Sequence, residues 1–539
     1  MIETKEMGAT YRSNATPAWM LYAGVLAALL PVMIWRDFTP DNELRYLSIA
    51  DEAIRNHDIF AFHNHGLAYA DKPPLYFWFL ILCRLTAGQH YMWLLSLGSL
   101  LPAFGVTAVM NRWCRQYLQE SGQDAPSART YASAFSGNLP GLMLLTCAYF
   151  LGASIILRMD MLMCLFIVLS LYIFWKIYSG KDSVRDRWLL PIYLFLALFT
   201  KGPLGILIPL CSTIVFLIIR RKAGLMRTVW GWRTWGVLAG LCALWFYGVY
   251  ADGGKEYLDN LLFHQTVDRA VDSFHHKRPA YYYLTAIWYI MAPWSLYVCG
   301  AVIADLRHSR RLPGLQQFFI TIGLTTLLLL SCISSKLQIY FLPAVPFMVY
   351  AAMMSLPEYQ GNLLTKISIA FPAAVFALAL PAVAASSAMG LADGYLSWYV
   401  YAAAAILTAG GVAGIAALCR RGAGPAVRVI AISMLGALFA GGFALRDLNG
   451  QMGYGALCRE AREISAAENV GEIYVWKIRR AENMDVYLGK NVIIIDEDSV
   501  PDPAALGDAL LLVRDKDAEQ FRPHSITEIP PYAIINLKH

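Results

Sequence analysis

The stretch AWMLYAGVLAALLPVMIW, residues 18 to 35, contains no charged residue. A helix rises about 1.5 Å per residue, so a helix of this length crosses most of the roughly 30 Å of hydrocarbon in a bilayer. Similar apolar stretches, separated by short polar loops, recur as far as about residue 446. The sequence therefore predicts a protein that crosses a membrane many times.

Hydropathy predicts a polytopic α-helical membrane protein with about thirteen transmembrane helices in residues 1–446. The composition agrees, because 58% of the 539 residues are hydrophobic and only 15% are charged. The expected spans are approximately residues 18–35, 91–113, 132–150, 160–178, 188–200, 203–220, 233–251, 281–303, 315–333, 339–356, 366–386, 395–418 and 427–446.

The loops between these spans predict how the chain is oriented. Lysine and arginine gather in alternate loops, and such loops face the cytoplasm. The residues in question are Arg112, Arg115, Arg129, Lys176, Lys181, Arg185, Arg187, Arg220, Arg221, Lys222, Arg227, Arg307, Arg310, Arg311, Lys366, Arg420, Arg421 and Arg428. We therefore expect a cytoplasmic N-terminus and, with an odd number of spans, an external C-terminus.

Residues 447–539 have a different composition from the spans. A polar helical pattern near residues 455–467 is followed by β-branched runs at 472–477 and 492–495, and ALLLVRD and AIINLK add two strand candidates. These elements predict a small α/β domain on the outer face of the membrane.

The long first loop, residues 36–90, contains two amphipathic segments. Residues 42–58 place Leu44, Leu47, Ile49 and Ile54 among charged residues, as in a helix lying at the membrane surface. A second segment starts at Pro73, and a proline pair is well suited to start a helix. Asp71 and Lys72 would then lie at the N-terminal edge of that helix.

Several functional classes lack their motifs. The sequence contains no GxGxxG, P-loop or HExxH motif, so it gives no support for a nucleotide cofactor or a zincin site. The basic residues are spread over loops rather than gathered in a nucleic-acid footprint. The ten cysteines form no CxxC pair.

Polar residues at the outer ends of the spans all fall on one predicted side of the membrane. Each alone is explained as a helix cap or an interface anchor, but together they predict a charged ligand. Cationic side chains suit a phosphate, and carboxylates suit a group rich in hydroxyls or amines. The set comprises Asp41, Asn42, Glu43, Tyr69, Asp71, Lys72, Arg158, Asp160, Lys201, His264, Arg269, Lys336 and Tyr340.

These residues belong to a series of motifs: a first-loop acidic residue, YxxKPPLYFW, RMD, KGPLG, HxxxxR and SKxxxYxLPxxP. In this order the series resembles the GT-C glycosyltransferases that use polyprenyl-phosphate sugars. It is most similar to the branch that transfers aminoarabinose to lipid A. The resemblance covers essentially the whole chain. It implies an inverting transferase of the bacterial inner membrane that moves a sugar such as 4-amino-4-deoxy-L-arabinose from undecaprenyl phosphate to lipid A on the periplasmic side.

The resemblance also implies roles for individual residues. Asp41, Lys72 and Asp160 would be catalytic, while Tyr69, Lys201, Arg269, Lys336 and Tyr340 would bind the substrate. His264 would belong to a zinc site, partnered in the family by a glutamate whose position is taken here by Asp71. Aspartate is one methylene shorter than glutamate, so this site departs from the family pattern.

Two alternatives stay open at this point. Protein O-mannosyltransferases of the same superfamily usually have adjacent Asp and Glu in the first loop, whereas here Asn42 separates Asp41 from Glu43. Asp41 would be a general base for a protein hydroxyl, but would only orient the substrate if the acceptor is an ionised lipid phosphate. A transporter of polyprenyl lipids is the second alternative. Transporters usually show an internal repeat, and we find none.

Overall fold

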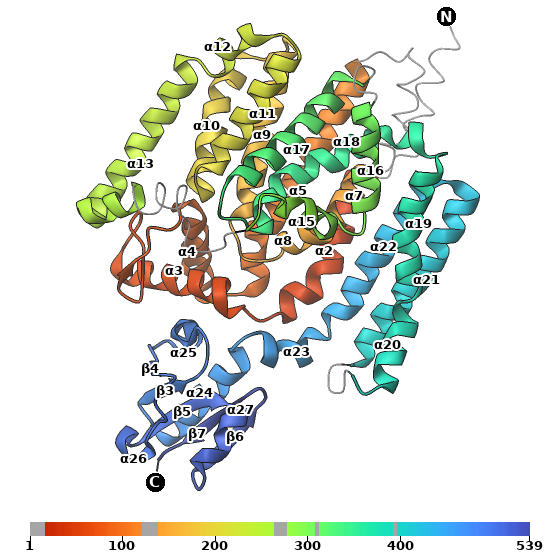
Figure 1. Ribbon diagram of the computed structural model, residues 1–539. Helices are drawn as coiled ribbons and strands as arrows, with labels where there is room; N and C mark the ends of the chain where they lie inside the picture. Colours follow the sequence, from red (N-terminus) through yellow and green to blue (C-terminus); the bar gives the residue numbers. More distant parts are fainter. Residues whose placement is uncertain (1–16, 121–137, 263–277, 308–311, 392–395, 539) are drawn as a thin grey trace, which may run out of the picture.

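The computed structural model describes residues 17–120, 138–262, 278–307, 312–391 and 396–538. It is a bundle of helices with a small sheet-containing unit at one end (Figure 1). Within the described residues, nine helical segments are long and apolar enough to cross a membrane. The predicted fold class, a polytopic helical membrane protein with a small C-terminal α/β unit, is thus confirmed, and the total of thirteen spans stays a prediction.

The membrane helices match the apolar stretches closely, but three predicted spans consist of two helices each. The spans at 132–150, 281–303 and 366–386 are divided between α7 and α8, α15 and α16, and α19 and α20. Pro293, which lacks an N–H, lies in the break between α15 and α16. The helices are α2 Ala18–Trp35, α5 Met92–Glu120, α7 Leu139–Leu145, α8 Ala148–Ala153, α9 Asp160–Tyr178, α10 Val184–Lys201, α11 Leu204–Ile219, α13 Trp232–Asp259, α15 Tyr282–Ile290, α16 Ser295–Arg307, α17 Gly314–Cys332, α18 Val345–Tyr359, α19 Leu363–Ala377, α20 Ala379–Ala388, α21 Trp398–Arg421 and α22 Ala423–Gly442.

The first loop folds into a π-helical turn, η1 (Pro40–Leu44), and two helices, α3 (Arg45–Asn56) and α4 (Leu75–Ala87). The expected helices are present, but α3 does not lay its apolar face on the membrane. Leu44, Leu47 and Ile49 are fully buried in a core that includes side chains of α4 and of the C-terminal unit. The sequence pattern showed an amphipathic helix but not what covers it.

The C-terminal unit (residues 445–538) contains a five-stranded mixed sheet in the order β4-β3-β5-β7-β6. Strand β3 pairs in parallel with β4 and β5, while β7 pairs antiparallel with β5 and β6. The elements are α23 Leu445–Met452, α24 Gly455–Glu468, β3 Glu472–Trp476, α25 Asp485–Leu488, β4 Ile493–Ile495, α26 Pro503–Leu506, β5 Ala509–Arg514, α27 Asp515–Ala518, β6 Ser525–Ile529 and β7 Tyr532–Asn536. The short edge strand β6 and the helix α23 were not expected.

The central strand β5 shows why the sheet is covered on both faces. Leu510 and Leu512 belong to the core shared with the first loop, whereas Leu511 and Val513 belong to a second core on the opposite face. Successive side chains of a strand point to opposite faces, so the apolar run ALLLV supplies both cores. The face of the sheet that carries Leu510 and Leu512 therefore packs against the first loop of the membrane unit.

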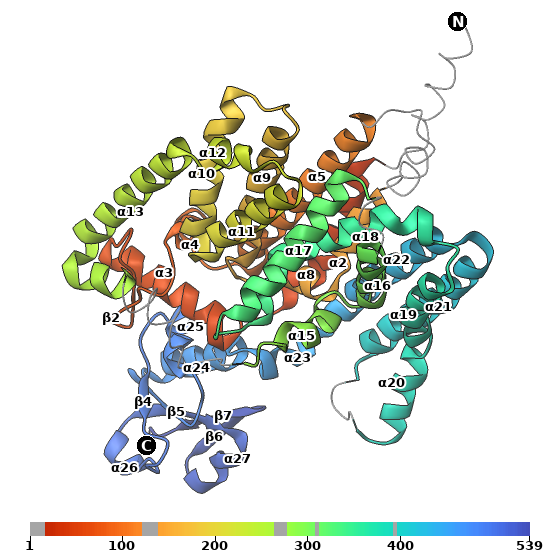
Figure 2. The same ribbon diagram turned by 45° about the horizontal axis from the view of Figure 1, so that its top comes forward.

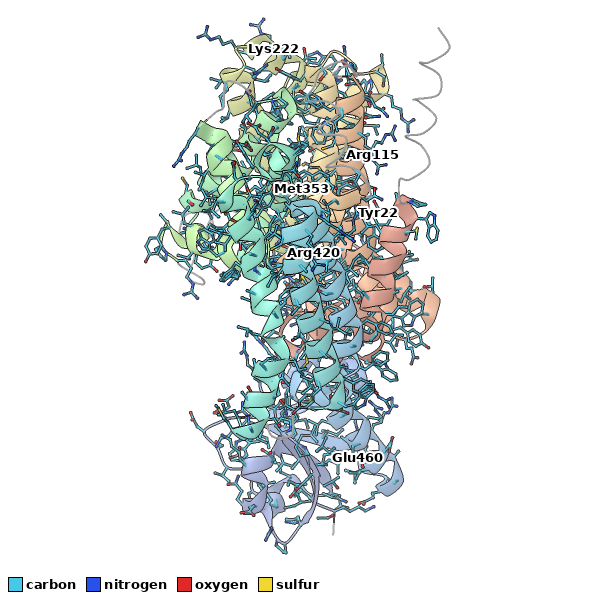
Figure 3. The ribbon with its side chains drawn as sticks, turned by 90° about the vertical axis from the view of Figure 1, so that its right-hand side faces the viewer. Tyr22, Arg115, Lys222, Met353, Arg420 and Glu460 are labelled. Carbon is cyan, nitrogen blue, oxygen red and sulfur yellow. The ribbon has the colours of Figure 1, made fainter. Side chains whose placement is uncertain are left out.

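The C-terminal unit lies against the first loop, at the same end of the bundle as α3 (Figure 2). Ser48 of α3 donates to the Asp485 carboxylate at 2.8 Å, and Asn449 donates to the carbonyl of Trp35 at the end of α2. Lys222, in a predicted cytoplasmic loop, lies at the far end of the molecule from Glu460 of the C-terminal unit (Figure 3). The two residues thus lie at opposite ends of the molecule, and which end faces the cytoplasm stays a prediction.

Candidate functional site

A buried carboxylate, Asp160, joins the ends of two membrane helices. It is the first residue of α9, where the helix dipole stabilises a negative charge. Its Oδ1 accepts a hydrogen bond from the ammonium of Lys201, the last residue of α10. Its Oδ2 accepts from Arg158 Nε at 3.3 Å. The side chains of Asp160 and Lys201 are only 2% and 7% exposed. A buried charge is costly unless it is paired, and here each of the two charged groups has the other as its partner.

The KGPLG segment fixes the place where Lys201 ends its helix. Gly202 has a φ of 108°, a conformation that a side chain would oppose, and Pro203 caps the start of α11. A Cβ at Gly205 would come within 2.4 Å of the Ala197 backbone, so this glycine lets α10 and α11 approach closely. The motif therefore directs the Lys201 side chain back toward Asp160.

Lys72 brings a further charge to this pair from the first loop. Arg158 and Lys72 both lie close enough to Lys201 for their charges to act on it. The Lys72 ammonium also lies 3.6 Å from a carboxylate oxygen of Asp71. The structure thus brings together Lys72, Asp160 and Lys201, which come from separate regions of the sequence.

The loop that leads to Lys72 is held from both sides. The Asp252 carboxylate, on α13, accepts the backbone N–H groups of residues 59–61 at 2.7–2.9 Å. Trp78 of α4 donates from its indole Nε1 to the carbonyl of Ile59 at 2.7 Å. The KPP helix is therefore attached to α13 through this loop rather than left to move freely.

Aromatic side chains surround the cations. The Lys201 ammonium lies 4.7 Å from the centre of the Tyr340 ring, and the Arg45 guanidinium lies 5.7 Å from that of Tyr69. Both distances are within the range of cation–π attraction. Tyr46 is buried, and burial raises the pKa of its hydroxyl although Arg158 and Arg45 oppose the shift. Tyr46 therefore stays neutral.

Arg45 also belongs to the site, although it lies outside the sequence motifs named above. It donates to Asn42 Oδ1 at 3.0 Å, and its Nε is buried without a hydrogen-bond partner among the described residues. A buried unpaired donor costs free energy, so this nitrogen is suited to an anionic ligand. In the sequence, Arg45 is visible only as a cation at the start of an amphipathic helix, and this does not distinguish it from other surface arginines.

Glu43 was noted only as one of the polar residues, and the structure gives it an anchoring position. Its carboxylate is fully buried and accepts two hydrogen bonds from Arg36, each of 2.7 Å. It also accepts from the backbone N–H groups of Thr39 at 2.8 Å and Leu157 at 2.9 Å. Glu43 therefore ties the first loop to the segment that carries Arg158 and Asp160.

Asp41 faces the C-terminal unit. Its half-exposed carboxylate lies 3.0 Å from Arg479 and 3.9 Å from Arg480. Lys336 is buried and donates to the carbonyl of Ile333. Within the described ranges, neither residue forms a hydrogen bond or ion pair with Asp160, Lys201 or Lys72. His264 and Arg269 lie outside the described residues.

The structure describes only one of the two expected metal ligands, Asp71, because His264 lies outside the described residues. Asp71, the proposed ligand, lies beside the Lys72 ammonium, and a cation at that distance disfavours a divalent ion. No group of three His, Cys, Asp or Glu side chains suited to a metal occurs in the part of the chain that the structure describes. A zinc site at Asp71 and His264 stays a prediction, and no step below depends on it.

The charges of the cluster do not cancel. Four basic side chains (Arg45, Lys72, Arg158 and Lys201) lie around two carboxylates (Asp71 and Asp160), so basic groups outnumber acidic ones. Such an excess in a partly buried site stabilises an anion, and it acts most strongly on charge that develops during a reaction. The arrangement suits a group whose negative charge increases, such as a departing phosphate.

Curated relatives share part of the chain, while no family model matches it. A Pseudomonas fluorescens protein named undecaprenyl phosphate-alpha-4-amino-4-deoxy-L-arabinose arabinosyl transferase 2 is 24% identical over 337 residues, 60% of this chain and 53% of the relative. A transferase of the same name, without the numeral, from Pseudomonas aeruginosa is 26% identical over 343 residues, 61% of this chain and 57% of that one. The chain thus spans about half the length of these relatives.

Two solved structures have the same fold as this chain. They are crystal structures of ArnT from Cupriavidus metallidurans, one bound to undecaprenyl phosphate and one in the apo state. The TM-scores are 0.71 and 0.70, at 19% sequence identity, and each match covers 96% of this chain and 97% of the other. The likeness extends over both the membrane bundle and the C-terminal unit.

Proposed function

We propose that this chain, which has the fold of the ArnT structures, is an inverting glycosyltransferase of the bacterial inner membrane. It transfers a sugar from an undecaprenyl phosphate donor to lipid A. The names of the relatives suggest that this sugar is 4-amino-4-deoxy-L-arabinose. The reaction takes place on the periplasmic side.

The observation that carries this proposal is the excess of basic over acidic side chains around Asp160 and Lys201. A polyprenyl-phosphate sugar is a phosphodiester with about one negative charge, and the polyprenyl phosphate that leaves is a monoester with about 1.5 to 2 charges near neutral pH. The site therefore stabilises the leaving group more strongly than the donor. Stronger binding of the developing charge accelerates the reaction.

The proposed reaction is a single displacement. An oxygen of the acceptor attacks the anomeric carbon of the sugar, and the bond from that carbon to the phosphate oxygen breaks. The electron pair goes to the phosphate, where Lys72 and Arg158 stabilise it. An acceptor phosphate is already ionised, so no residue needs to remove a proton. The configuration at the anomeric carbon inverts.

The other residues hold this arrangement. Lys201 and Asp160 neutralise each other and fix the ends of α9 and α10 beside the phosphate. Tyr69 and Tyr340 supply aromatic walls next to Arg45 and Lys201. For Arg269 and Lys336 we retain the substrate-binding role that the resemblance implies.

Asp41 is proposed to orient the substrate from the face that it shares with the C-terminal unit. A residue that contacts the substrate and one that only joins two units respond differently to mutation. Asp41→Ala is expected to lower kcat/KM at least tenfold more than Arg479→Ala, because the arginine is an exposed partner whose loss costs little. Equal small losses in both variants, measured with one donor and acceptor, would reduce Asp41 to a contact between units.

The orientation of the chain has its own test. A reporter that is active only outside the cytoplasm, fused after Leu445, is expected to be active because nearly all short-loop lysines and arginines lie on the opposite side. The same reporter fused after Arg220 is the matched control and is expected to be inactive. The reverse pattern of activity would place the whole site on the cytoplasmic side.

The proposed activity is tested directly by transfer. Purified protein given an undecaprenyl phosphate donor with a radiolabelled sugar is expected to move the label to lipid A. A transporter would leave the label on the donor.

A further inference from the structure

A cavity of about 520 Å³ lies between the first loop and the C-terminal unit, and the proposed reaction does not use it. Its volume is within the range of about 300–1,000 Å³ that is typical of small-ligand sites. The walls come from the segment after α2, the end of α4, helix α24 and the end of α25. The cavity therefore depends on both units being in place.

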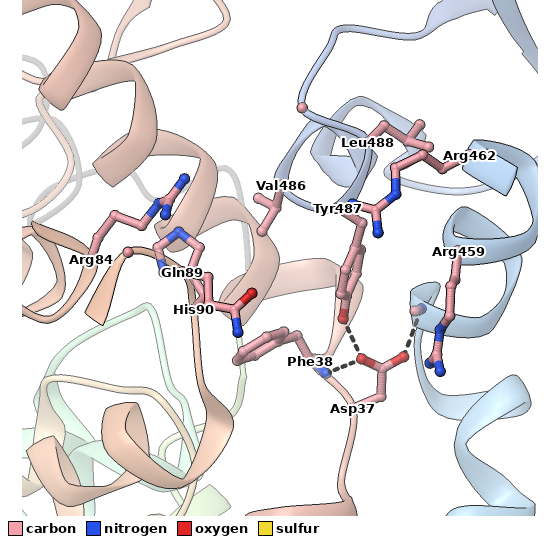
Figure 4. A pocket seen from close by; sticks show the side chains of 13 residues that line it. Asp37, Phe38, Arg84, Gln89, His90, Arg459, Arg462, Val486, Tyr487 and Leu488 are labelled. Carbon is pink, nitrogen blue, oxygen red and sulfur yellow. Dashed lines mark hydrogen bonds between the residues drawn. The ribbon is translucent and has the colours of Figure 1, made fainter. Parts of the chain in front are cut away.

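Arginines line two sides of this cavity. Arg84 lies on the first-loop side, and Arg459 and Arg462 lie on the side of α24 (Figure 4). Residues three apart on a helix share a face, so the two arginines of α24 act together. Both are exposed, and neither forms an ion pair with any described residue.

The first-loop side is organised by Asp51. Its Oδ1 accepts from Arg84 Nε at 3.1 Å and lies 3.0 Å from His90 Nε2. Burial raises the pKa of Asp51, but His90 and Arg84 outweigh burial and hold that pKa below its usual value. Only Nε of Arg84 is used in this contact, so its two terminal nitrogens are left for a ligand.

His90 provides a second, independent indication of a ligand. Its side chain is only 6% exposed and lines the cavity. Its Nδ1 is buried and has no hydrogen-bond partner among the described residues. A buried polar nitrogen without a partner costs free energy, so a polar ligand in the cavity would be favoured here.

Asp37 is the one carboxylate among the described residues that line the cavity, and its oxygens are already occupied. They accept from the Tyr487 hydroxyl and from the backbone N–H groups of Phe38 at 2.8 Å and Gly455 at 2.7 Å (Figure 4). The charged side chains of the cavity that remain available to a ligand are therefore the three arginines.

We propose that this cavity binds a phosphate monoester carried by a sugar, as in the headgroup of a phosphorylated glycolipid. Guanidinium groups bind phosphate oxygens in a bidentate manner, and three arginines from two sides can enclose one phosphate. The volume leaves room for the attached sugar. Leu82 and Leu85, also on α4, are exposed and apolar. Binding here does not require the transferase activity.

The test uses the purified full chain in neutral detergent and isothermal titration with glucose 1-phosphate, inorganic phosphate and glucose. We expect glucose 1-phosphate to bind, inorganic phosphate to bind more weakly, and glucose not to bind. The double variant Arg459→Gln, Arg462→Gln is expected to weaken glucose 1-phosphate binding at least tenfold. Arg522→Gln, an exposed arginine elsewhere in the C-terminal unit, is the matched control and should bind normally.

Three results would overturn the proposal. Glucose 1-phosphate binding that is absent, or unchanged in the double variant, would show that the cavity is not its site. Binding that is lost in Lys72→Ala but kept in the double variant would place the ligand in the Asp160 cluster instead. Inorganic phosphate binding as tightly as glucose 1-phosphate would assign the cavity to free phosphate and refute the headgroup.

Discussion

Replacing Lys72 with alanine is expected to lower the rate of sugar transfer at least about a hundredfold. A preorganised charge that faces a developing oxyanion contributes on the order of 10² to 10³ in rate. Because the charge on the phosphate grows during the reaction, kcat and kcat/KM should fall together. Initial rates at saturating and at limiting donor concentration measure both constants.

The matched control is Lys255→Ala, which removes an exposed lysine at the end of α13, away from the described cluster. This variant is expected to transfer sugar at the normal rate. If Lys72→Ala turned over normally with only a raised KM, Lys72 would be a binding residue and the leaving-group argument would fail. Arg269→Ala, suggested by the resemblance, is expected to behave like Lys72→Ala.

Of the substitutions proposed here, Glu43→Ala is expected to lower the free energy of unfolding the most. Glu43→Ala leaves the buried Arg36 guanidinium without its partner and orphans the N–H group of Leu157. Breaking a buried ion pair in this way lowers the free energy of unfolding by about 3–5 kcal/mol. Unfolding can be followed with a thiol-reactive dye, because Cys83, Cys164 and several other cysteines are buried.

The same carboxylate predicts a dependence on pH. Burial raises the pKa of Glu43, but Arg36 and the N–H groups of Thr39 and Leu157 outweigh burial, and the net shift is below the ordinary value of 4.5. A carboxylate with a lowered pKa stabilises the protein above its unfolded-state pKa, and this stabilisation is lost as the pH falls through its folded-state pKa. The difference in stability between the native chain and Glu43→Gln should therefore shrink below about pH 4.5.

The exposed Glu256 on α13 offers the control for both measurements. Glu256→Ala is expected to change stability by no more than about 0.5 kcal/mol, as for most surface substitutions. A loss in Glu43→Ala no larger than this would mean that the Glu43 and Arg36 pair does not hold the first loop in place.

The membrane helices could be predicted from the sequence because the bilayer limits their length and composition. The span expected at residues 160–178 is α9, and the one expected at 18–35 is α2. The partners of α3 could not be predicted in this way. Its apolar face has the pattern of a membrane-surface helix, but the C-terminal unit, which is distant in the sequence, covers it.

Part of the candidate site could be predicted because the membrane also limits where the loops lie. Alternation of the loops places polar span ends, Asp160 and Lys201 among them, on one side of the membrane, but it does not predict which of them pair. The choice among Asp41, Asn42 and Glu43 depends on the π-helical turn, which directs Asp41 toward Arg479, Asn42 toward Arg45 and Glu43 toward Arg36. Three adjacent polar residues look alike in a sequence, and only the folded turn shows that each has a different partner.

The most direct test of the central claim follows the labelled sugar rather than the lipid. Purified protein in vesicles receives an undecaprenyl phosphate donor with a radiolabelled sugar together with lipid A, and the two lipids are separated after the reaction. We expect the label to appear on lipid A with inverted anomeric configuration, and Lys72→Ala to abolish most of this transfer. Label that stays on the donor while the donor changes leaflet would contradict this expectation, because the chain would then move a lipid without making a bond.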